Sequence, residues 1–147
     1  MSNITDLTQR PPRSIRTRLG GYALLPRMLD KGRAEIAGKS GDYHFNCPVD
    51  QRILGYLGIE AEALKAELAA GKGDGEILGW IRSHQANKHT DVEIEAWSDA
   101  AEKRAPDAES LEFFNDLRKA AAPQRSDIST WADLLDVDDY VTFGGKA

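Results

Sequence analysis

The chain has 147 residues, of which 41% are hydrophobic and 29% are charged, and it contains a single cysteine. One domain of this length removes roughly two thirds of its unfolded surface from water, so neither a disulfide nor a structural metal is required for stability. The formal net charge of −5 argues against non-specific binding of nucleic acid, which needs a basic surface, and no apolar run approaches the ~20 residues of a membrane span.

The first segment of the chain is basic, whereas the remainder is acidic. Residues 1–40 contain eight Lys and Arg against three Asp and Glu, and residues 41–147 contain eleven against twenty-one. We therefore expect a basic N-terminal arm, residues 1–19, followed by a helical domain, residues 20–147. This asymmetry indicates an anionic partner or docking of the arm on its own domain.

The spacing of apolar residues, together with Gly and Pro residues between the apolar segments, predicts four helices in the first half of the chain. We place them within residues 21–38, at residues 48–57, at residues 60–70, and from Asp74 to just before residue 83. The predicted buried stripe of the first helix consists of Leu25, Met28, Leu29 and Ile36.

The second half of the chain contains the clearest sequence signal for the start of a helix. Thr90 and Glu93 have the spacing of a capping box, in which each side chain binds the backbone N–H of the other residue. Further helices are predicted over residues 107–121 and 130–135.

These elements predict an all-α fold: a compact single domain of six or seven short helices. Alternation of β-branched residues is scarce, which leaves one small β-hairpin near residues 34–46 and one extended piece at 140–143 as the candidate β structure.

Several strings of the sequence resemble a bacterial family known as domain of unknown function 5069. They are PRSIR at 12–16, LGGY at 19–22, PRMLDK at 26–31 with Arg33, YHFNCP at 43–48 and GDGEIL at 73–78. The similarity covers nearly the whole chain and is strongest from residue 10 to residue 82. It implies a small soluble single-domain protein and carries over no catalytic residue, because the family has no assigned activity.

The arginine-rich arm is the first candidate site. The guanidinium groups of Arg13, Arg16 and Arg18 suit bidentate pairing with a carboxylate or phosphate. Two interpretations remain open: these arginines meet an anionic ligand, or they strap the arm to the acidic body of the protein.

Charged residues of the first helix are a second candidate. Asp30 lies three residues from both Arg27 and Arg33, so ion pairs within the helix explain these residues without a ligand. If the helix is largely enclosed, the group becomes an organised polar network. That network lines a cleft together with Tyr22, His44 and Asp50.

Cys47 precedes Pro48 at a predicted helix start, with His44 nearby, so a nucleophilic or redox centre of Cys47 and His44 is the enzymatic alternative. The simpler interpretation is a small buried side chain beside a helix cap. As the only cysteine, Cys47 cannot form an internal disulfide. Residues 1–6 lack the features of a secretory signal, so we expect a reducing, cytoplasmic setting.

No metal and no cofactor are expected. One cysteine and three scattered histidines lack the paired spacing of zinc sites. The adjacent residues Phe113 and Phe114 diverge by about 100° on a helix, so one of them is free to contact a partner, and a homodimer is an open hypothesis.

The sequence therefore favours a non-enzymatic binding or interaction domain for an anionic small molecule or a protein partner. Its predicted binding residues are Arg13, Arg16, Arg18, Tyr22, Arg33, His44 and Asp50. We expect neither a membrane nor nucleic acid as a partner.

Overall fold

The computed structural model describes residues 5–147, so residues 1–4 of the expected arm lie outside the described part. Seven helices follow one another: α1 (Leu25–Ile36), α2 (Pro48–Leu57), α3 (Ala61–Ala69), α4 (Asp74–His84), α5 (Asp91–Lys103), α6 (Leu111–Ala121) and α7 (Trp131–Thr142). The predicted all-α fold of six or seven helices is confirmed. Within residues 5–147, none of these helices is long and apolar enough to cross a membrane.

Local signals set several helix boundaries. Pro48 occupies the first position of α2, and Gly58 ends this helix with a left-handed φ of 72°. The capping box at the start of α5 is also formed: the Glu93 N–H donates to Thr90 Oγ1 (3.2 Å), and the Thr90 N–H donates to the Glu93 carboxylate (2.8 Å).

The predicted β structure is wrong. Residues 37–46 form turns, and the region that the structure describes contains only an isolated bridge between Leu19 and Tyr22. Residues 140–142 are not extended but belong to α7, which continues well past the predicted end at residue 135. The backbone leaves α1 through Gly38 and Gly41, whose left-handed φ angles produce turns instead of a strand.

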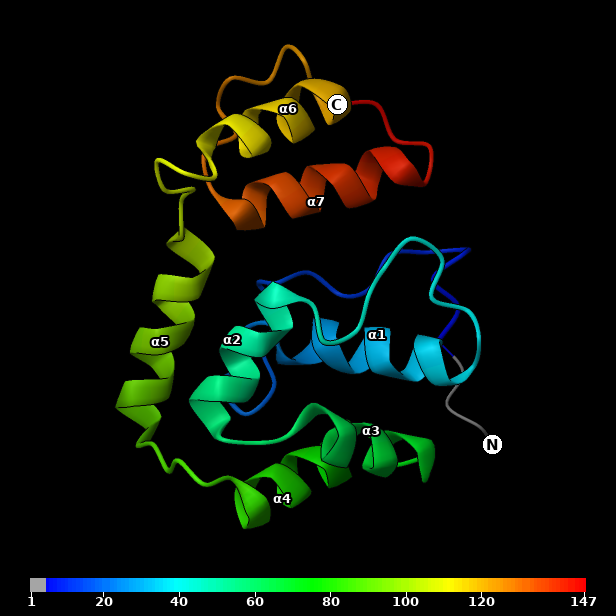
Figure 1. Cartoon of the computed structure of the whole chain (residues 1–147), viewed down its shortest axis with the longest axis vertical. Coiled ribbons are helices and arrows are strands. Elements are labelled where there is room, and N and C mark those ends of the chain that lie inside the picture. The colour runs from blue at the N-terminus through cyan, green and yellow to red at the C-terminus, as the bar shows by residue number, and fades with distance from the viewer. Residues whose placement is uncertain (1–4) are drawn as a thin grey trace.

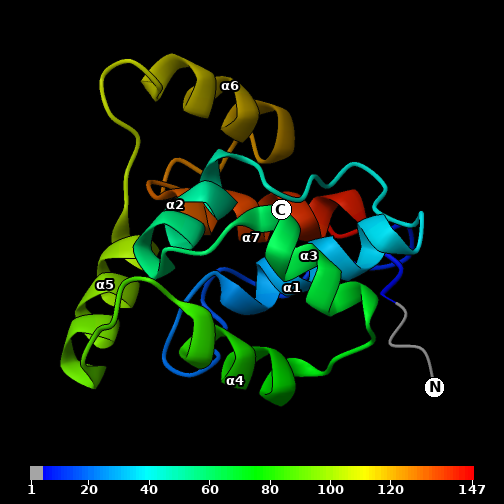
Figure 2. The same cartoon turned by 60° about the horizontal axis from the view of Figure 1, so that its bottom comes forward.

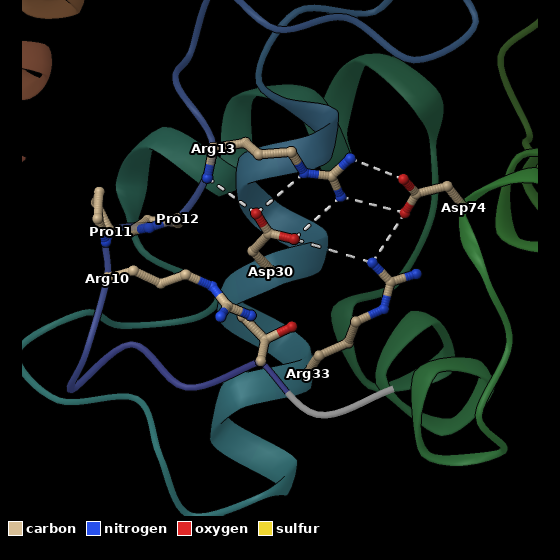
Figure 3. A pocket seen from close by; sticks show the side chains of 8 residues that line it. Arg10, Pro11, Pro12, Arg13, Asp30, Arg33 and Asp74 are labelled. Carbon is tan, nitrogen blue, oxygen red and sulfur yellow. Dashed lines mark hydrogen bonds and ion pairs between the residues drawn. The ribbon is translucent and has the colours of Figure 1, made fainter. Parts of the chain in front are cut away.

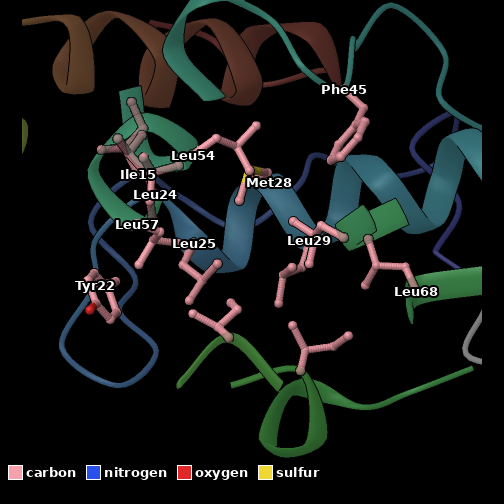
Figure 4. Packing of buried hydrophobic residues seen from close by; sticks show 14 of the residues in the cluster. Ile15, Tyr22, Leu24, Leu25, Met28, Leu29, Phe45, Leu54, Leu57 and Leu68 are labelled. Atoms are coloured by element: carbon pink, nitrogen blue, oxygen red, sulfur yellow. The ribbon is translucent and has the colours of Figure 1, made fainter. Parts of the chain in front are cut away.

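Helix α1 lies at the centre of the molecule, with α2 beside it and α3 and α4 beneath (Figure 1). Ten of its twelve residues are buried. Leu25, Met28 and Leu29 face the main core, as predicted, but Ile36 at the end of the stripe is 41% exposed. Figure 4 shows side chains from the arm, α1, α2 and α3 meeting in this core.

Gly32 allows α3 to approach α1 closely. A Cβ at Gly32 would lie 2.6 Å from Leu68 Cδ1 and 3.2 Å from the Phe45 ring, so a larger residue would push these side chains away.

A second, smaller core joins α6 to α7. Phe114 is buried there and meets the Trp131 ring edge to face, with 5.0 Å between the ring centroids. In both views α7 lies between α6 and α1 (Figures 1 and 2). Ala132 of α7 belongs to the main core with α1, and an ion pair between Arg27 and Asp139 also joins these two helices, as described below.

Candidate functional site

The side chains of four charged residues on α1 are buried: Arg27, Asp30, Lys31 and Arg33. Each pairs with a residue from another segment of the chain. Because a buried charge is costly without a partner, these pairs fix the neighbouring segments around α1.

Arg27 connects α1 to α7. Its guanidinium donates to both carboxylate oxygens of Asp139, at 2.8 and 3.3 Å. The Tyr43 hydroxyl donates to the same carboxylate at 2.8 Å. Burial and this hydrogen bond raise the pKa of Tyr43, so the phenol stays protonated. The predicted pairing of Arg27 with Asp30 is replaced by this long-range pair.

Lys31 connects α1 to α2. Its ammonium lies 2.9 Å from Asp50 Oδ1 and donates to Cys47 Sγ at 3.3 Å. Asp50 also accepts the backbone N–H of Asn46 (2.9 Å). This arrangement uses Asp50 and Lys31 to hold the start of α2 against α1.

Arg13 joins the arm to both α1 and α4. Its Nε and Nη2 donate to the Asp30 carboxylate, at 3.1 and 3.0 Å, and its Nη1 donates to Asp74 at 2.7 Å. Arg33 donates to the other oxygen of Asp74 at 2.8 Å. The hydrogen bonds from Arg13 and Arg33 hold the pKa of Asp74 below its usual range, despite an opposing effect of burial.

The other two arginines of the predicted site are also paired with the body. Arg16 contacts Asp133 and Asp136 of α7. Arg18 contacts residues 99 and 102 of α5. Each of these guanidinium groups therefore already has two carboxylate partners.

A cavity of about 620 Å³ opens between the arm and the body. We call it the arm pocket. It is lined by Thr5, Arg10, Pro11, Pro12 and Arg13 of the arm, by Asp30 and Arg33 of α1, and by Asp74 of α4. Figure 3 shows three guanidinium groups and two carboxylates around this cavity.

Two arginines of the arm pocket retain unused donors. Arg33 is only 6% exposed, and its buried Nε has no hydrogen-bond partner among the described residues. Its two terminal nitrogens are occupied by Asp74 and the Lys72 carbonyl. Arg10 is exposed and forms no ion pair within residues 5–147. The unpaired guanidinium of Arg10 is suited to bind an anion, whereas the Nε of Arg33 is enclosed by protein and has almost no surface open to the cavity.

The predicted binding residues do not all meet in this pocket. Arg13 and Arg33 line it. Tyr22 is instead buried in the main core, 2% exposed, and Asp50 serves the Lys31 pair. His44 is exposed on the loop before α2.

Arg18 lines a different cavity, of about 390 Å³, beside Gly20, Gly21 and the start of α5. Among residues 5–147, no group of three His, Cys, Asp or Glu side chains is placed to hold a metal ion.

A comparison with protein families gives one match. The family model described as domain of unknown function DUF5069 covers residues 9–141. The chain belongs to the DUF5069 family. No curated protein matches it. The DUF5069 segment contains every residue of the arm pocket except Thr5, so the cavity is formed almost entirely within the family domain.

Sequence reasoning missed Thr5, Arg10 and Asp74. Arg10 has a detectable signal, because it begins the same arginine-rich run as Arg13 and is followed by two prolines. Asp74 is 61 residues away from Arg13 and was interpreted only as a helix start. Nothing in the local pattern links it to the arm.

Proposed function

We propose that this DUF5069 chain is a non-enzymatic binding domain for a small anionic molecule, and that the arm pocket holds the anion. One observation carries this proposal: Arg10 lines the pocket with an exposed side chain that forms no ion pair within residues 5–147. Such a guanidinium can bind an anion in the pocket through bidentate hydrogen bonds.

The charges of the pocket support this assignment. Three arginines and two aspartates leave one positive charge uncompensated among the lining residues. Arg10 carries this charge, because the two aspartates bind Arg13 and Arg33. The pocket therefore combines the paired guanidinium groups of Arg13 and Arg33 with the unpaired one of Arg10.

The arm is prepared for binding before a ligand arrives. Pro11 and Pro12 restrict the backbone between Arg10 and Arg13, and Arg13 is anchored to α1 and α4. The backbone of Arg10 therefore requires little further ordering, which lowers the entropic cost of binding.

Thermal unfolding in the presence of anions tests the proposal. The probes are inorganic phosphate, sulfate, nucleotides and aromatic and aliphatic carboxylates. A ligand at 100 times its Kd stabilises the native state by about 2.7 kcal/mol, which raises the melting temperature of a chain of this size by about 5–10 °C.

Arg10→Ala is the decisive variant, because this exposed side chain has no ion pair to lose. Arg125→Ala is the matched control: Arg125 is also exposed, but it pairs with its neighbour Asp127, outside the pocket. We expect stabilisation by one class of anion to be lost in Arg10→Ala and retained in Arg125→Ala. The proposal would be overturned if anions stabilise both variants equally, or if no anion stabilises the wild type.

Thiol chemistry at Cys47 is the second candidate, supported by the Lys31 ammonium 3.3 Å from the sulfur. The rate of alkylation by iodoacetamide measures this activation directly. A faster reaction in the folded protein than in the urea-unfolded chain supports an activated thiol. A slower one removes this candidate.

A further inference from the structure

Building on the proposed function, we infer that the ligand of the arm pocket is a small organic acid that presents one carboxylate. The pocket holds this group at the unpaired guanidinium of Arg10, with the rest of the acid against Pro11 and Pro12.

The charge of the pocket selects a monoanion. Three guanidinium groups face two carboxylates, so one further negative charge completes the balance. A phosphate monoester carries almost two negative charges at neutral pH. It would place an excess negative charge next to Asp30 and Asp74, whose carboxylates already line the cavity.

The geometry of the existing pairs shows how a carboxylate fits. Asp74 bridges two arginines, with Oδ2 accepting from Arg13 (2.7 Å) and Oδ1 from Arg33 (2.8 Å). Asp30 likewise uses both of its oxygens on Arg13. A ligand carboxylate would repeat the pairing of Asp30, with both of its oxygens accepting from the guanidinium of Arg10.

The size of the cavity requires more than a carboxylate. About 620 Å³ lies within the range of ~300–1,000 Å³ that is typical of pockets for small organic ligands. Pro11 and Pro12 supply the apolar part of the wall, adjacent to Arg10 in Figure 3. A compact ring or branched hydrocarbon is the matching body for the acid, because it buries apolar surface against the proline rings.

Three probes with the same phenyl ring separate shape from charge. Benzoate is planar and monoanionic, benzenesulfonate is tetrahedral and monoanionic, and phenyl phosphate is tetrahedral and largely dianionic at pH 8. Isothermal titration calorimetry at pH 8 should give the tightest binding for benzoate and at least about ten-fold weaker binding for phenyl phosphate, a difference of about 1.4 kcal/mol.

The pH provides an internal check. The second pKa of a phosphate monoester is about 6, so phenyl phosphate becomes a monoanion at pH 5, where the lowered pKa of Asp74 keeps this carboxylate ionised. Its affinity should therefore rise relative to that of benzenesulfonate between pH 8 and pH 5. Arg10→Ala should weaken the binding of all three probes, whereas Arg125→Ala should leave their binding unchanged.

The outcomes separate this inference from the proposed function. Two results would overturn the carboxylate inference and leave anion binding intact, provided that the binding is lost in Arg10→Ala. One is tighter binding of phenyl phosphate than of benzoate at pH 8. The other is binding of nucleotides without binding of any carboxylate. Failure of every anion to bind in an Arg10-dependent manner would overturn both.

Discussion

The pair between Arg27 and Asp139 gives the strongest prediction about stability. Both side chains are buried, with exposed fractions of 5% and 8%, and Tyr43 donates to the same carboxylate. Asp139→Ala leaves a buried guanidinium and a phenol hydroxyl without their main acceptor. Removing one partner of a buried ion pair typically costs about 3–5 kcal/mol.

Arg27 would keep its hydrogen bond of 3.3 Å to the Arg13 carbonyl and its position over the Tyr43 ring, and neither replaces the lost carboxylate. We therefore expect the free energy of unfolding to fall by about 3–5 kcal/mol and the melting temperature by about 10 °C. Equilibrium unfolding in urea measures the change, followed by circular dichroism and by tryptophan fluorescence, to which Trp131 at the start of α7 contributes.

Two further variants make the test specific. The double variant Arg27→Met/Asp139→Leu removes both charges and should recover the part of the lost stability that is due to the unpaired guanidinium, because apolar replacements for a buried pair are often neutral. Asp127→Ala breaks an exposed pair with Arg125 and should cost less than about 1 kcal/mol. If Asp139→Ala lowers the free energy of unfolding by less than about 1 kcal/mol, or if the double variant is no more stable than Asp139→Ala, then the buried pair does not contribute as stated.

Further predictions follow from single features. The pairs with arginine lower the pKa of Asp74, so this carboxylate stabilises the native state above pH ~4 and loses the effect as the pH falls through its folded pKa. Urea unfolding should therefore show that the free energy of unfolding falls less between pH 6 and pH 2 in Asp74→Asn than in the wild type. Phe114→Ala should lower the free energy of unfolding by about 3–5 kcal/mol, because this side chain is buried. Phe113→Ala, at a position 61% exposed, should change it by less than about 0.5 kcal/mol. Equal effects of the two variants would contradict the assigned helix face. Homodimerisation through Phe113 stays a prediction, and light scattering at high concentration checks it. Thr90→Ala should lower the melting temperature by removing about 1 kcal/mol of capping energy, with Thr90→Ser close to the wild type.

Much of the fold could be predicted because its signals are local. The proline and glycine that bound α2 and the capping box of α5 act within one helical turn. The divergence of Phe113 and Phe114 follows from helix geometry alone, and their exposures of 61% and 2% agree with it.

The site was less predictable because its contacts are distant in sequence. Arg27 meets a residue 112 positions away, and Arg13 meets one 61 positions away. Spacing within α1 predicted pairs of Asp30 with both Arg27 and Arg33, but only Arg33 approaches Asp30, at 4.0 Å. The length of α7 was underestimated for the same reason, since Asp139 is held by partners on the first part of the chain.

The most direct test of anion binding is the side-chain Nε–H signal of Arg33 in a two-dimensional ¹H–¹⁵N spectrum. During titration with benzoate, this signal should move in a concentration-dependent manner in the wild type, because Arg33 lines the pocket and a carboxylate bound there changes the electrostatic field at its Nε–H. The shift should disappear in Arg10→Ala and persist in Arg125→Ala. An Arg33 signal that stays fixed while benzoate, phosphate and nucleotides are added in turn would contradict anion binding in the arm pocket.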